Sequence, residues 1–419
     1  MGLWTQFDYW PYKRRKQSLT DPGKQPRVSG AQGKLSWIPG GSPQGKTPEQ
    51  TQASKLLAET SHEVTRLRST SVSIGCQRFL PLMFLGAALS ASSAIGATCT
   101  TASQLTAAQR DTLSGVARSM MGQVKNGDTE GLRAATIPAV ASNFGGIASS
   151  ADALKPILQQ AALTVDHIYL LDATQDQGGG VQFFCSPASS TLTVVLNFSA
   201  LPPGKYAVAI LHATGVSKPQ QISLVLNETG TDQWKLAGFF ARPMTMAGHD
   251  GVWYWTQARS YAQRKMNWNA WFYYQTAAFL LDPADFLSSP NLEKLNREEN
   301  GAHPEGLPAG SAVPLNANGS TFQVTGYETS SALGGFDFVV HYTPDASQAA
   351  QLRDPVAARK QAVELMTALL SSRPELREAF HGIWVRADQG DASLFALELP
   401  MNEIAGSQPQ AMNSAPVVQ

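Results

Sequence analysis

Hydrophobic residues of this 419-residue chain first recur at helical spacing and later at strand spacing. Leu113, Val116 and Met120 lie three to four residues apart behind Thr106, and Gln109 completes a capping-box pattern with Thr106. This spacing predicts a helix that begins after Thr106. The same reading predicts two more helices, one after Asn126-Gly127-Asp128 and one over about 150–163.

The period changes to two at residue 164, which is typical of β-strands. The predicted strands are Thr164–Asp172, Gly180–Cys185, Ser190–Asn197, Lys205–His212, Gln220–Asn227 and Trp234–Phe240. Turn residues such as Asn227-Glu228-Thr229-Gly230 separate them, as expected for antiparallel hairpins. Helices followed by a meander of strands indicate the α+β fold class, with 98–248 as the first folded domain.

An aromatic-rich stretch over 252–283 follows and predicts a helical hairpin within 249–283. Small Ala258 and Ala270 allow two antiparallel helices to approach closely, and aromatic side chains fill the groove between them. Two interpretations stay open for the tryptophans of this stretch: they belong to the core, or they line an aromatic binding face. These tryptophans are Trp253, Trp255, Trp268 and Trp271.

The remainder of the chain divides into three parts. Residues 284–320 lose periodicity and are rich in Pro, Gly and Asn, which predicts a linker. Residues 321–404 read strand, strand, helix, strand, strand, a small α+β sandwich whose helix begins with Asp354 as cap and Pro355 in its first turn. We interpret His341 and His381 in this part as structural or surface residues. Residues 405–419 are expected to be a disordered tail.

Two motifs give the first domain a family resemblance. They are the NGDTEGL turn at 126–132 and the closing ISLVLNETGTDQWKLAGFF hairpin at 222–240. With the opening helix, they make about residues 103–248 resemble the nuclear-transport-factor-2-like and ketosteroid-isomerase-like family. The resemblance implies a cone-shaped, curved antiparallel sheet with helices closing one end over an apolar pocket. It does not imply enzymatic activity, because many members only bind a ligand or partner.

The hairpin that follows also resembles a known repeat. Tyr254, Ala258, Tyr261, Ala270 and Tyr274 fall where a tetratricopeptide repeat places its characteristic large and small residues. Only one copy is present over about 252–283, whereas a solenoid needs about three. The resemblance therefore implies a single helical hairpin packed on the preceding domain, with a peptide-binding groove as the alternative.

The uncharged run Phe79 to Ala97 predicts export. Basic residues precede it, its first half is apolar and its second half is small, which is the order of a secretory signal. We assign 64–97 to a signal peptide cut after Ala94 or Ala97, and we expect a periplasmic or secreted protein. A retained membrane anchor and lipidation of Cys99 are the alternatives.

The Pro-, Gly-, Gln- and Lys-rich segment 1–63 is expected to be a disordered leader. Our hypothesis is that the start of the reading frame lies further downstream, with a cytoplasmic tail as the alternative. Of 32 basic and 32 acidic residues, 12 and 5 precede residue 79, so the exported part keeps 20 and 27 and a net charge of −7. An acidic surface excludes nucleic acid and anionic membrane as expected partners.

The number of cysteines also bears on the predicted export. If Cys76 is removed with the leader, Cys99 and Cys185 remain, and a pair in an oxidising compartment predicts a disulfide, with two free thiols as the alternative. Neither Cys-x-x-Cys nor another Cys/His ligand spacing is present in the sequence, so no metal site and no cofactor is predicted.

The sequence contains no motif of a nucleophile elbow, a dinucleotide-binding loop or a phosphate-binding loop. We therefore predict an exported, non-enzymatic binding protein, whose ligand is a small apolar molecule or a protein or peptide partner. An alternative is a small-molecule isomerase or hydrolase-type enzyme that uses the cone pocket. His167 and Tyr169 alternate onto one face of the strand at 164–172 with Val165, and His212 lies on a later strand, so the three are candidate acid, base and donor groups. Ordinary strand residues are the competing interpretation for them. A structural component of the cell envelope is the third alternative.

Overall fold

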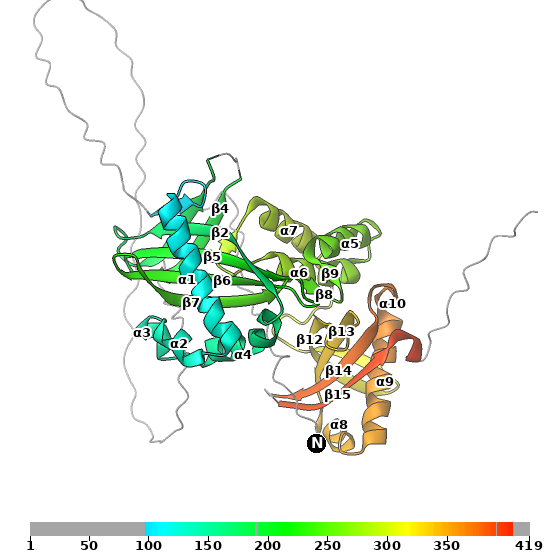
Figure 1. Cartoon of the computed structure of the whole chain (residues 1–419). Helices are drawn as coiled ribbons and strands as arrows, with labels where there is room; N and C mark the ends of the chain where they lie inside the picture. The colour runs from blue at the N-terminus through cyan, green and yellow to red at the C-terminus, as the bar shows by residue number, and fades with distance from the viewer. Residues whose placement is uncertain (1–96, 189–191, 391, 405–419) are drawn as a thin grey trace, which may run out of the picture. The chain divides into compact units, whose positions relative to one another are not determined.

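The computed structural model describes residues 97–188, 192–390 and 392–404, and these residues belong to one compact unit (Figure 1). The predicted leader at 1–63, the signal segment at 64–97 except Ala97, and the predicted tail at 405–419 lie outside the described residues. Among the helices of the described residues, none combines the length and the apolar character needed to cross a membrane.

Four helices open the described part of the chain: α1 (Ala107–Asn126), α2 (Thr129–Ala134), α3 (Pro138–Ala141) and α4 (Gly145–Leu158). The predicted capping box is confirmed, because the Thr106 side chain accepts from the Gln109 backbone N–H and the Gln109 side chain accepts from the Thr106 N–H. Helix α1 ends at Gly127, whose φ of 72° is the left-handed conformation that glycine adopts without strain.

The third helix differs from the predicted range of about 150–163 at both ends, because α4 begins at Gly145 and ends at Leu158, and β2 already begins at Ala162. Two glycines in its first turn disfavour a helix, but its buried residues Ala151, Leu154 and Leu158 pack in the core and stabilise it. Tertiary burial outweighs the roughly 1 kcal/mol that each glycine costs in a helix.

Two antiparallel sheets follow the helices. The larger sheet has the order β1-β2-β5-β6-β7 and the smaller one has the order β10-β4-β3. The strands of the larger sheet are β1 (Thr98–Thr101), β2 (Ala162–Asp172), β5 (Lys205–Thr214), β6 (Gln220–Gly230) and β7 (Gln233–Pro243). The strands of the smaller sheet are β3 (Gly179–Cys185), β4 (Val194–Leu201) and β10 (Leu287–Ser288).

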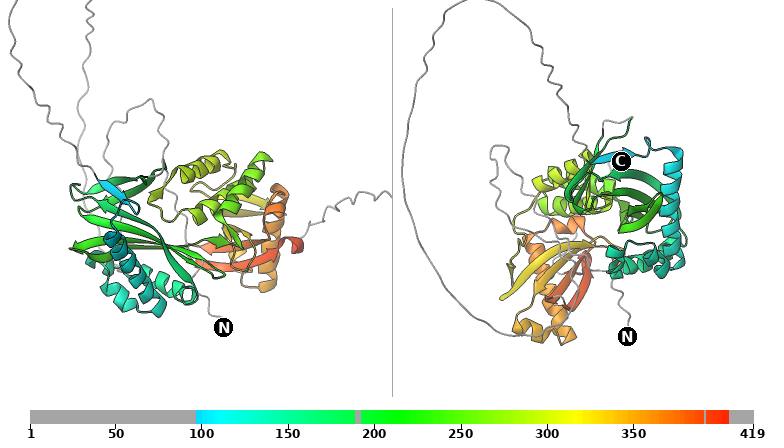
Figure 2. Two further views of the ribbon diagram at one scale, coloured as in Figure 1. Left: turned by 45° about the horizontal axis from the view of Figure 1, so that its top comes forward. Right: turned by 90° about the vertical axis from the view of Figure 1, so that its left-hand side faces the viewer.

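The central strands β5 and β6 of the larger sheet are buried on both faces, as the alternating residues of β5 show. Ala207, Ala209 and Leu211 belong to the core beneath the helices, where α1 lies across the strands (Figure 2). Val208 and Ile210 point the opposite way, into a second core shared with the smaller sheet. Buried apolar side chains from α1 and α4, such as Leu113 and Leu154, complete the core between the helices and this sheet.

A β-bulge in β2 corrects the predicted face of Val165. The pairing with β5 shifts between Val165 and His167, so Asp166 is an extra residue in the strand. Val165 therefore packs with Ile168 against the helix-side core, whereas His167 starts the opposite face together with Tyr169. A bulge adds one residue to a strand and leaves no mark in the pattern of apolar and polar residues. Strict period-two alternation therefore assigned Val165 to the wrong face.

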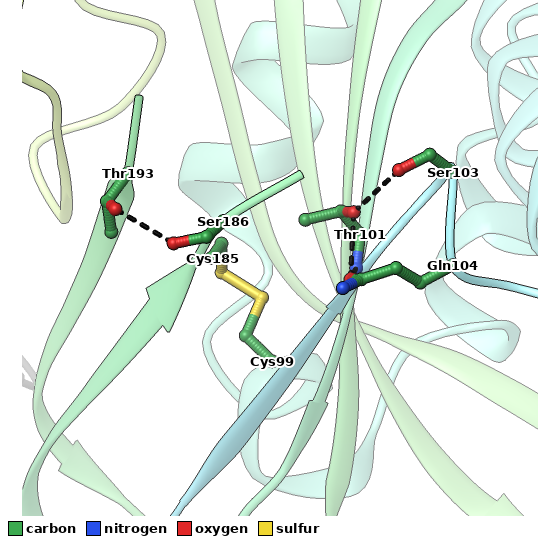
Figure 3. Close-up of a disulfide and its surroundings, with 7 residues drawn as sticks. All are labelled: Cys99, Thr101, Ser103, Gln104, Cys185, Ser186 and Thr193. Carbon is green, nitrogen blue, oxygen red and sulfur yellow. Dashed lines mark hydrogen bonds between the residues drawn. A yellow bond between two sulfur atoms is a disulfide. The ribbon is translucent and has the colours of Figure 1, made fainter. Parts of the chain in front are cut away.

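The predicted disulfide between Cys99 and Cys185 is present in the structure, with 5.2 Å between the Cα atoms (Figure 3). Cys99 lies on β1 of the larger sheet and Cys185 on β3 of the smaller one. The bond therefore joins the two sheets across 86 positions of sequence, at the margin of the core that they share.

The predicted helical hairpin is present as α5 (Gly251–Gln263) and α6 (Asn267–Leu281), after the short strands β8 (Thr245–Met246) and β9 (His249–Asp250). The stretch 284–320 is not the predicted structureless linker, since it holds β10, helix α7 (Pro290–Gly301) and strand β11 (Val313–Ala317). Ser289 caps α7 by accepting from the Leu292 N–H, and Leu295 of α7 is buried in the same core as the hairpin.

The last part of the described chain has α+β structure, with a five-stranded sheet in the order β11-β12-β13-β14-β15. Its further strands are β12 (Ser320–Ser330), β13 (Asp337–Thr343), β14 (Gly382–Gln389) and β15 (Ala392–Pro400). Its helices are α8 (Ala346–Gln351), α9 (Pro355–Ser372) and α10 (Leu376–Ala379), and Met401–Glu403 forms a 3-10 turn. Strands β13 and β14 are parallel, with α8, α9 and α10 in the connection between them, and the other neighbours are antiparallel.

The hairpin shares its hydrophobic core with the C-terminal sheet. Trp268 and Phe272 of α6 pack on Phe338 of β13, and Leu365 of α9 belongs to the same buried cluster. Tyr273 of α6 also donates a hydrogen bond of 2.6 Å to the Ala379 carbonyl. The hairpin therefore shares its core with the C-terminal sheet and not with the preceding domain, on which the repeat resemblance implied that it would pack.

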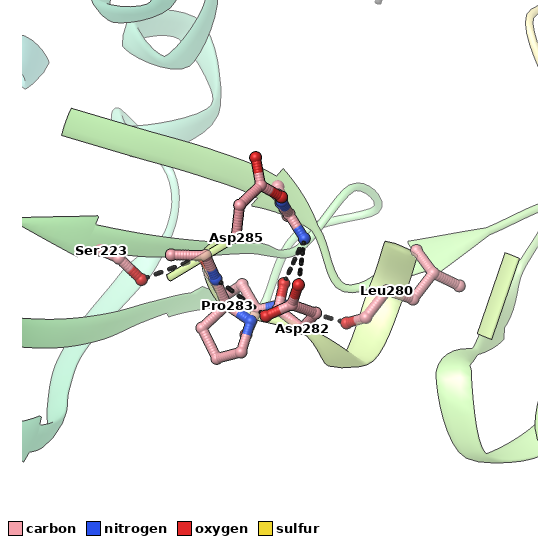
Figure 4. A network of polar contacts seen from close by, with 8 residues as sticks. Ser223, Leu280, Asp282, Pro283 and Asp285 are labelled. Carbon is pink, nitrogen blue, oxygen red and sulfur yellow. Dashed lines mark hydrogen bonds and ion pairs between the residues drawn. The ribbon is translucent and has the colours of Figure 1, made fainter. Parts of the chain in front are cut away.

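Polar contacts join the end of α6 to the larger sheet (Figure 4). Ser223 donates to the Pro283 carbonyl at 3.1 Å, and Arg242 donates to the Asp282 carbonyl at 2.8 Å. Arg242 also pairs with the carboxylates of Asp282 and Asp285. Burial raises the pKa of Asp282 to about 6 although the Arg242 charge opposes it.

Candidate functional site

The C-terminal sheet has one apolar face and one charged face, because its strands alternate with period two. Phe338 and Val340 of β13 and Val385 of β14 point toward the helices and belong to the buried core. The opposite face of the sheet carries a carboxylate from each of four neighbouring strands. They are Glu328 of β12, Asp337 of β13, Asp388 of β14 and Glu398 of β15, and we call this surface the charged face.

His341 lies between two of these carboxylates. Its Nδ1 is 2.6 Å from Asp388 Oδ2 and its Nε2 is 3.0 Å from Glu328 Oε1. The His341 and Asp388 side chains are mostly buried, with 17% and 12% of their surface exposed, and Glu328 is 44% exposed. Strand pairing sets this arrangement, because β13 lies between β12 and β14.

The surroundings of His341 favour the charged imidazolium. Burial alone would lower the pKa of His341, but the hydrogen bonds and charges of Asp388 and Glu328 outweigh burial and raise the pKa to about 9. Burial likewise acts to raise the pKa of Asp388, but the hydrogen bond from His341 and its charge dominate and lower it. Both ring nitrogens thus donate to carboxylates near neutral pH, which leaves His341 without a lone pair for general-base chemistry.

A second group lies at the other end of the same face, where β13 and β14 begin. His381 Nδ1 is 3.1 Å from Asp337 Oδ1, and Trp384 Nε1 donates to Asp337 Oδ2 at 3.3 Å. Glu398 pairs with Trp384 across β14 and β15, which brings its carboxylate to the same place. One ligand atom each from Asp337, His381 and Glu398 lie within 4.8 Å of one another.

These three residues differ in exposure. The Asp337 side chain is fully buried, whereas 56% of the His381 side chain is exposed. Burial raises the pKa of Glu398, and the negative charge of Asp337 raises it further. Glu398 Oε1 is buried and, within the described part of the chain, has no hydrogen-bond partner. Two carboxylates and an imidazole so close together form a donor set that could hold a cation.

The predicted catalytic candidates lie in the first domain, on the face of the larger sheet opposite the helices. His167 is exposed and its ring lies 6.2 Å from that of Tyr169. Tyr169 is 7% exposed within the core between the two sheets, and burial raises its pKa. His212 Nδ1 is 3.1 Å from a carboxylate oxygen of Asp166, the bulge residue of β2.

The four tryptophans of the hairpin are buried or partly buried and pack against other side chains. Trp268 and Trp271 are buried, at 5% and 3% exposure. Trp253 is partly buried and stacks on His249 with 3.7 Å between ring centroids. Trp255, also partly buried, donates to Glu298 Oε2 at 2.7 Å and lies beneath the Arg259 guanidinium. A binding role for these residues remains a prediction, and their contacts place them against the core of the hairpin and C-terminal sheet.

Sequence reasoning missed the charged face, since it interpreted His341 and His381 as structural or surface residues. The alternation Asp337-Phe338-Val339-Val340-His341 already places Asp337 and His341 on one side of a strand. The partners on the neighbouring strands depend on register, which this local pattern does not determine.

Comparisons with protein families, curated proteins and solved structures found no match for this chain.

Proposed function

We propose that this protein is an exported, non-enzymatic binding protein that takes a positively charged ligand on the charged face of its C-terminal sheet. One observation carries the proposal: four adjacent strands each contribute one carboxylate, Glu328, Asp337, Asp388 and Glu398, to the same face. Basic side chains also lie on this face, since Arg386 of β14 is in register with His341 of β13, but the four carboxylates outnumber them.

The chemistry of the face supports binding over catalysis. His341 is a charged donor held by Asp388 and Glu328, so it positions carboxylates and does not take up protons near neutral pH. The candidates of the first domain are not paired with one another as acid and base, because His212 contacts Asp166 and the contact of His167 with Tyr169 is between rings. The net charge of −7 after residue 97 attracts cations at long range.

Two further observations support export. A disulfide such as Cys99–Cys185 persists in oxidising compartments and is rare in the cytosol. The uncharged run Phe79 to Ala97, with its small residues at the end, has the composition of a cleaved signal. In this proposal the first domain, with its helices and meander of strands, keeps the nuclear-transport-factor-2-like resemblance and acts as a scaffold.

Export and ligand charge are tested separately. N-terminal sequencing of the protein from the periplasm or medium of its own source is expected to begin near residue 98. A full-length chain recovered from the cytosol, with leader intact and cysteines reduced, contradicts export.

Ligand charge is tested by titrating the exported chain, with its disulfide formed, with a tetralysine peptide at low ionic strength. The double variant Glu328→Gln and Glu398→Gln removes the two more exposed carboxylates and leaves buried Asp337 in place. We expect this variant to weaken peptide binding on the order of tenfold or more, because it removes charge-assisted hydrogen bonds.

The matched control is the double variant Asp111→Asn and Asp152→Asn, which changes the net charge equally at exposed positions of α1 and α4. It is expected to bind tetralysine like the wild type. Equal weakening by both double variants would show a non-specific charge effect, and an absence of binding by the wild type would contradict the proposed ligand class. Thermal melts by circular dichroism check that each variant is folded.

A further inference from the structure

The group Asp337, His381 and Glu398 on the charged face has the donor set and spacing of a metal site. Their ligand atoms lie within 4.8 Å of one another, and the Asp337–His381 pair is at 3.1 Å. Ligand atoms bound at about 2.1 Å to one ion lie about 3 to 4 Å apart, so small side-chain rotations complete the geometry. We infer that this group binds a divalent transition-metal ion, with Zn²⁺ as the ion we expect to bind most tightly among common ones.

The contacts behind these side chains position them as in known metal sites. Trp384 Nε1 donates to Asp337 Oδ2, which leaves Oδ1 facing His381. The His381 backbone is held on both sides, because its N–H donates to the Phe336 carbonyl at 2.8 Å and its carbonyl accepts from the Met401 N–H at 2.9 Å. Such outer contacts fix the orientation of ligating groups and contribute to metal affinity.

Two glycines leave the space that the group occupies. A Cβ added at Gly335 would lie 2.4 Å from His381 Nδ1. One added at Gly382 would lie 2.4 Å from Glu398 Oε1 and 3.2 Å from Asp337 Oδ1. Any larger residue at either position would displace a donor atom of the group, so the close approach of the three side chains depends on these glycines.

The unpaired Glu398 oxygen supports a cation as the missing partner. Glu398 Oε1 is buried and has no hydrogen-bond partner among the residues that the structure describes, although it lies beside a second carboxylate. A buried acceptor without a donor costs about 1 to 3 kcal/mol, and a bound cation removes that cost. The exposed edge of His381 leaves a route for the ion and open positions for water.

The donor types select the class of ion. One imidazole nitrogen and two carboxylate oxygens suit Zn²⁺ and Mn²⁺, whereas Ca²⁺ and Mg²⁺ prefer oxygen donors alone. The ion takes the place of the Nδ1 proton of His381, so binding releases that proton where the Nδ1–H tautomer is present. The inference rests on the proposed function for the sign of the ligand charge and adds its chemical class and location.

The test uses the exported chain with its disulfide formed, after metal is stripped with a chelator. Zn²⁺ alone is titrated by calorimetry and in competition with a chromophoric chelator, and we expect one ion per chain. His381→Ala and Glu398→Gln are each expected to weaken Zn²⁺ binding on the order of tenfold or more, and Trp384→Phe to weaken it less. His303→Gln removes an exposed histidine that packs on Trp271 and is not one of the three ligands, and this variant is expected to bind Zn²⁺ as the wild type does.

Co²⁺ gives a second readout, because its visible absorption depends on the ligands and their geometry. We expect the Co²⁺ spectrum of the wild type to change in His381→Ala and to stay unchanged in His303→Gln. The inference is overturned if the wild type binds no Zn²⁺ stoichiometrically, or if His381→Ala and Glu398→Gln, both folded by circular dichroism, bind it as the wild type does. If the wild type binds tetralysine but not Zn²⁺, only the metal site is refuted. If the wild type binds neither tetralysine nor Zn²⁺, the proposed function is refuted too.

Discussion

The imidazolium of His341 gives the C-terminal domain a pH-dependent stability that can be measured. Its pKa is raised from 6.5 to about 9 in the folded chain, since the effects of Asp388 and Glu328 outweigh burial. That difference corresponds to about 3 kcal/mol of stabilisation by the protonated ring. Because the folded pKa is the higher one, the stabilisation is complete below about pH 6.5 and is lost as pH rises through about 9.

The variant His341→Gln removes this contribution and leaves the two carboxylates in place. We expect it to be less stable than the wild type by up to about 3 kcal/mol at pH 6, and the difference to shrink steadily toward pH 10. Urea unfolding at a series of pH values, with the disulfide intact, measures both free energies. His303→Gln is the control and should show no such pH-dependent difference.

A difference between wild type and His341→Gln that stays constant from pH 6 to pH 10 would refute this reasoning. It would mean that His341 is neutral in the folded chain or that its contribution comes from packing alone. A difference that grows with pH would reverse the sign and show a lowered pKa for His341. The acid side has the opposite sense: the lowered pKa of Asp388 gives stability that is lost as pH falls through its folded value.

Two other changes test the structure elsewhere. Replacing Cys99 and Cys185 together with Ser is expected to lower the free energy of unfolding by about 4 to 5 kcal/mol, because the disulfide closes a loop with a sequence separation of 86. Urea unfolding measures this loss, and a loss below about 1 kcal/mol would contradict the loop-closure argument. Gly382→Ala places a Cβ 2.8 Å from the Leu399 carbonyl oxygen, so it is expected to lower the free energy of unfolding by about 1 to 3 kcal/mol and to weaken Zn²⁺ binding. Unchanged stability and unchanged Zn²⁺ affinity would show that the strands adjust to the added methyl group.

Local signals in the sequence predicted much of the fold. The capping box at Thr106 and the cap at Asp354 with Pro355 at the first turn are both present, because such caps are satisfied by residues within a few positions. The predicted strands match those of the structure to within a few residues, although β4 begins at Val194. The Cys99–Cys185 pairing also followed from the count of cysteines outside the leader.

The stretch 284–320 shows where a local signal was present but outweighed. Ser289 followed by Pro290, with Glu293 in the first turn, is a helix start, and α7 begins there. The surrounding Pro, Gly and Asn residues favoured a linker. What stabilises α7 is contact with α6 and the burial of Leu295 in the core of the hairpin, which depends on a helix earlier in the chain.

By itself the sequence determined helix caps, strand periodicity, the α+β class and the choice of cysteine partners, since each depends on neighbours or on a simple count. Only the tertiary structure decided that Asp388 and Glu398 join Asp337 and His341 on one face. That depends on the parallel pairing of β13 with β14, in which Phe338 is the direct partner of Ile383 although α8, α9 and α10 separate the two strands in the sequence. Period-two alternation tells which residues of one strand share a side, but the register between distant strands is set by the packing of the whole core.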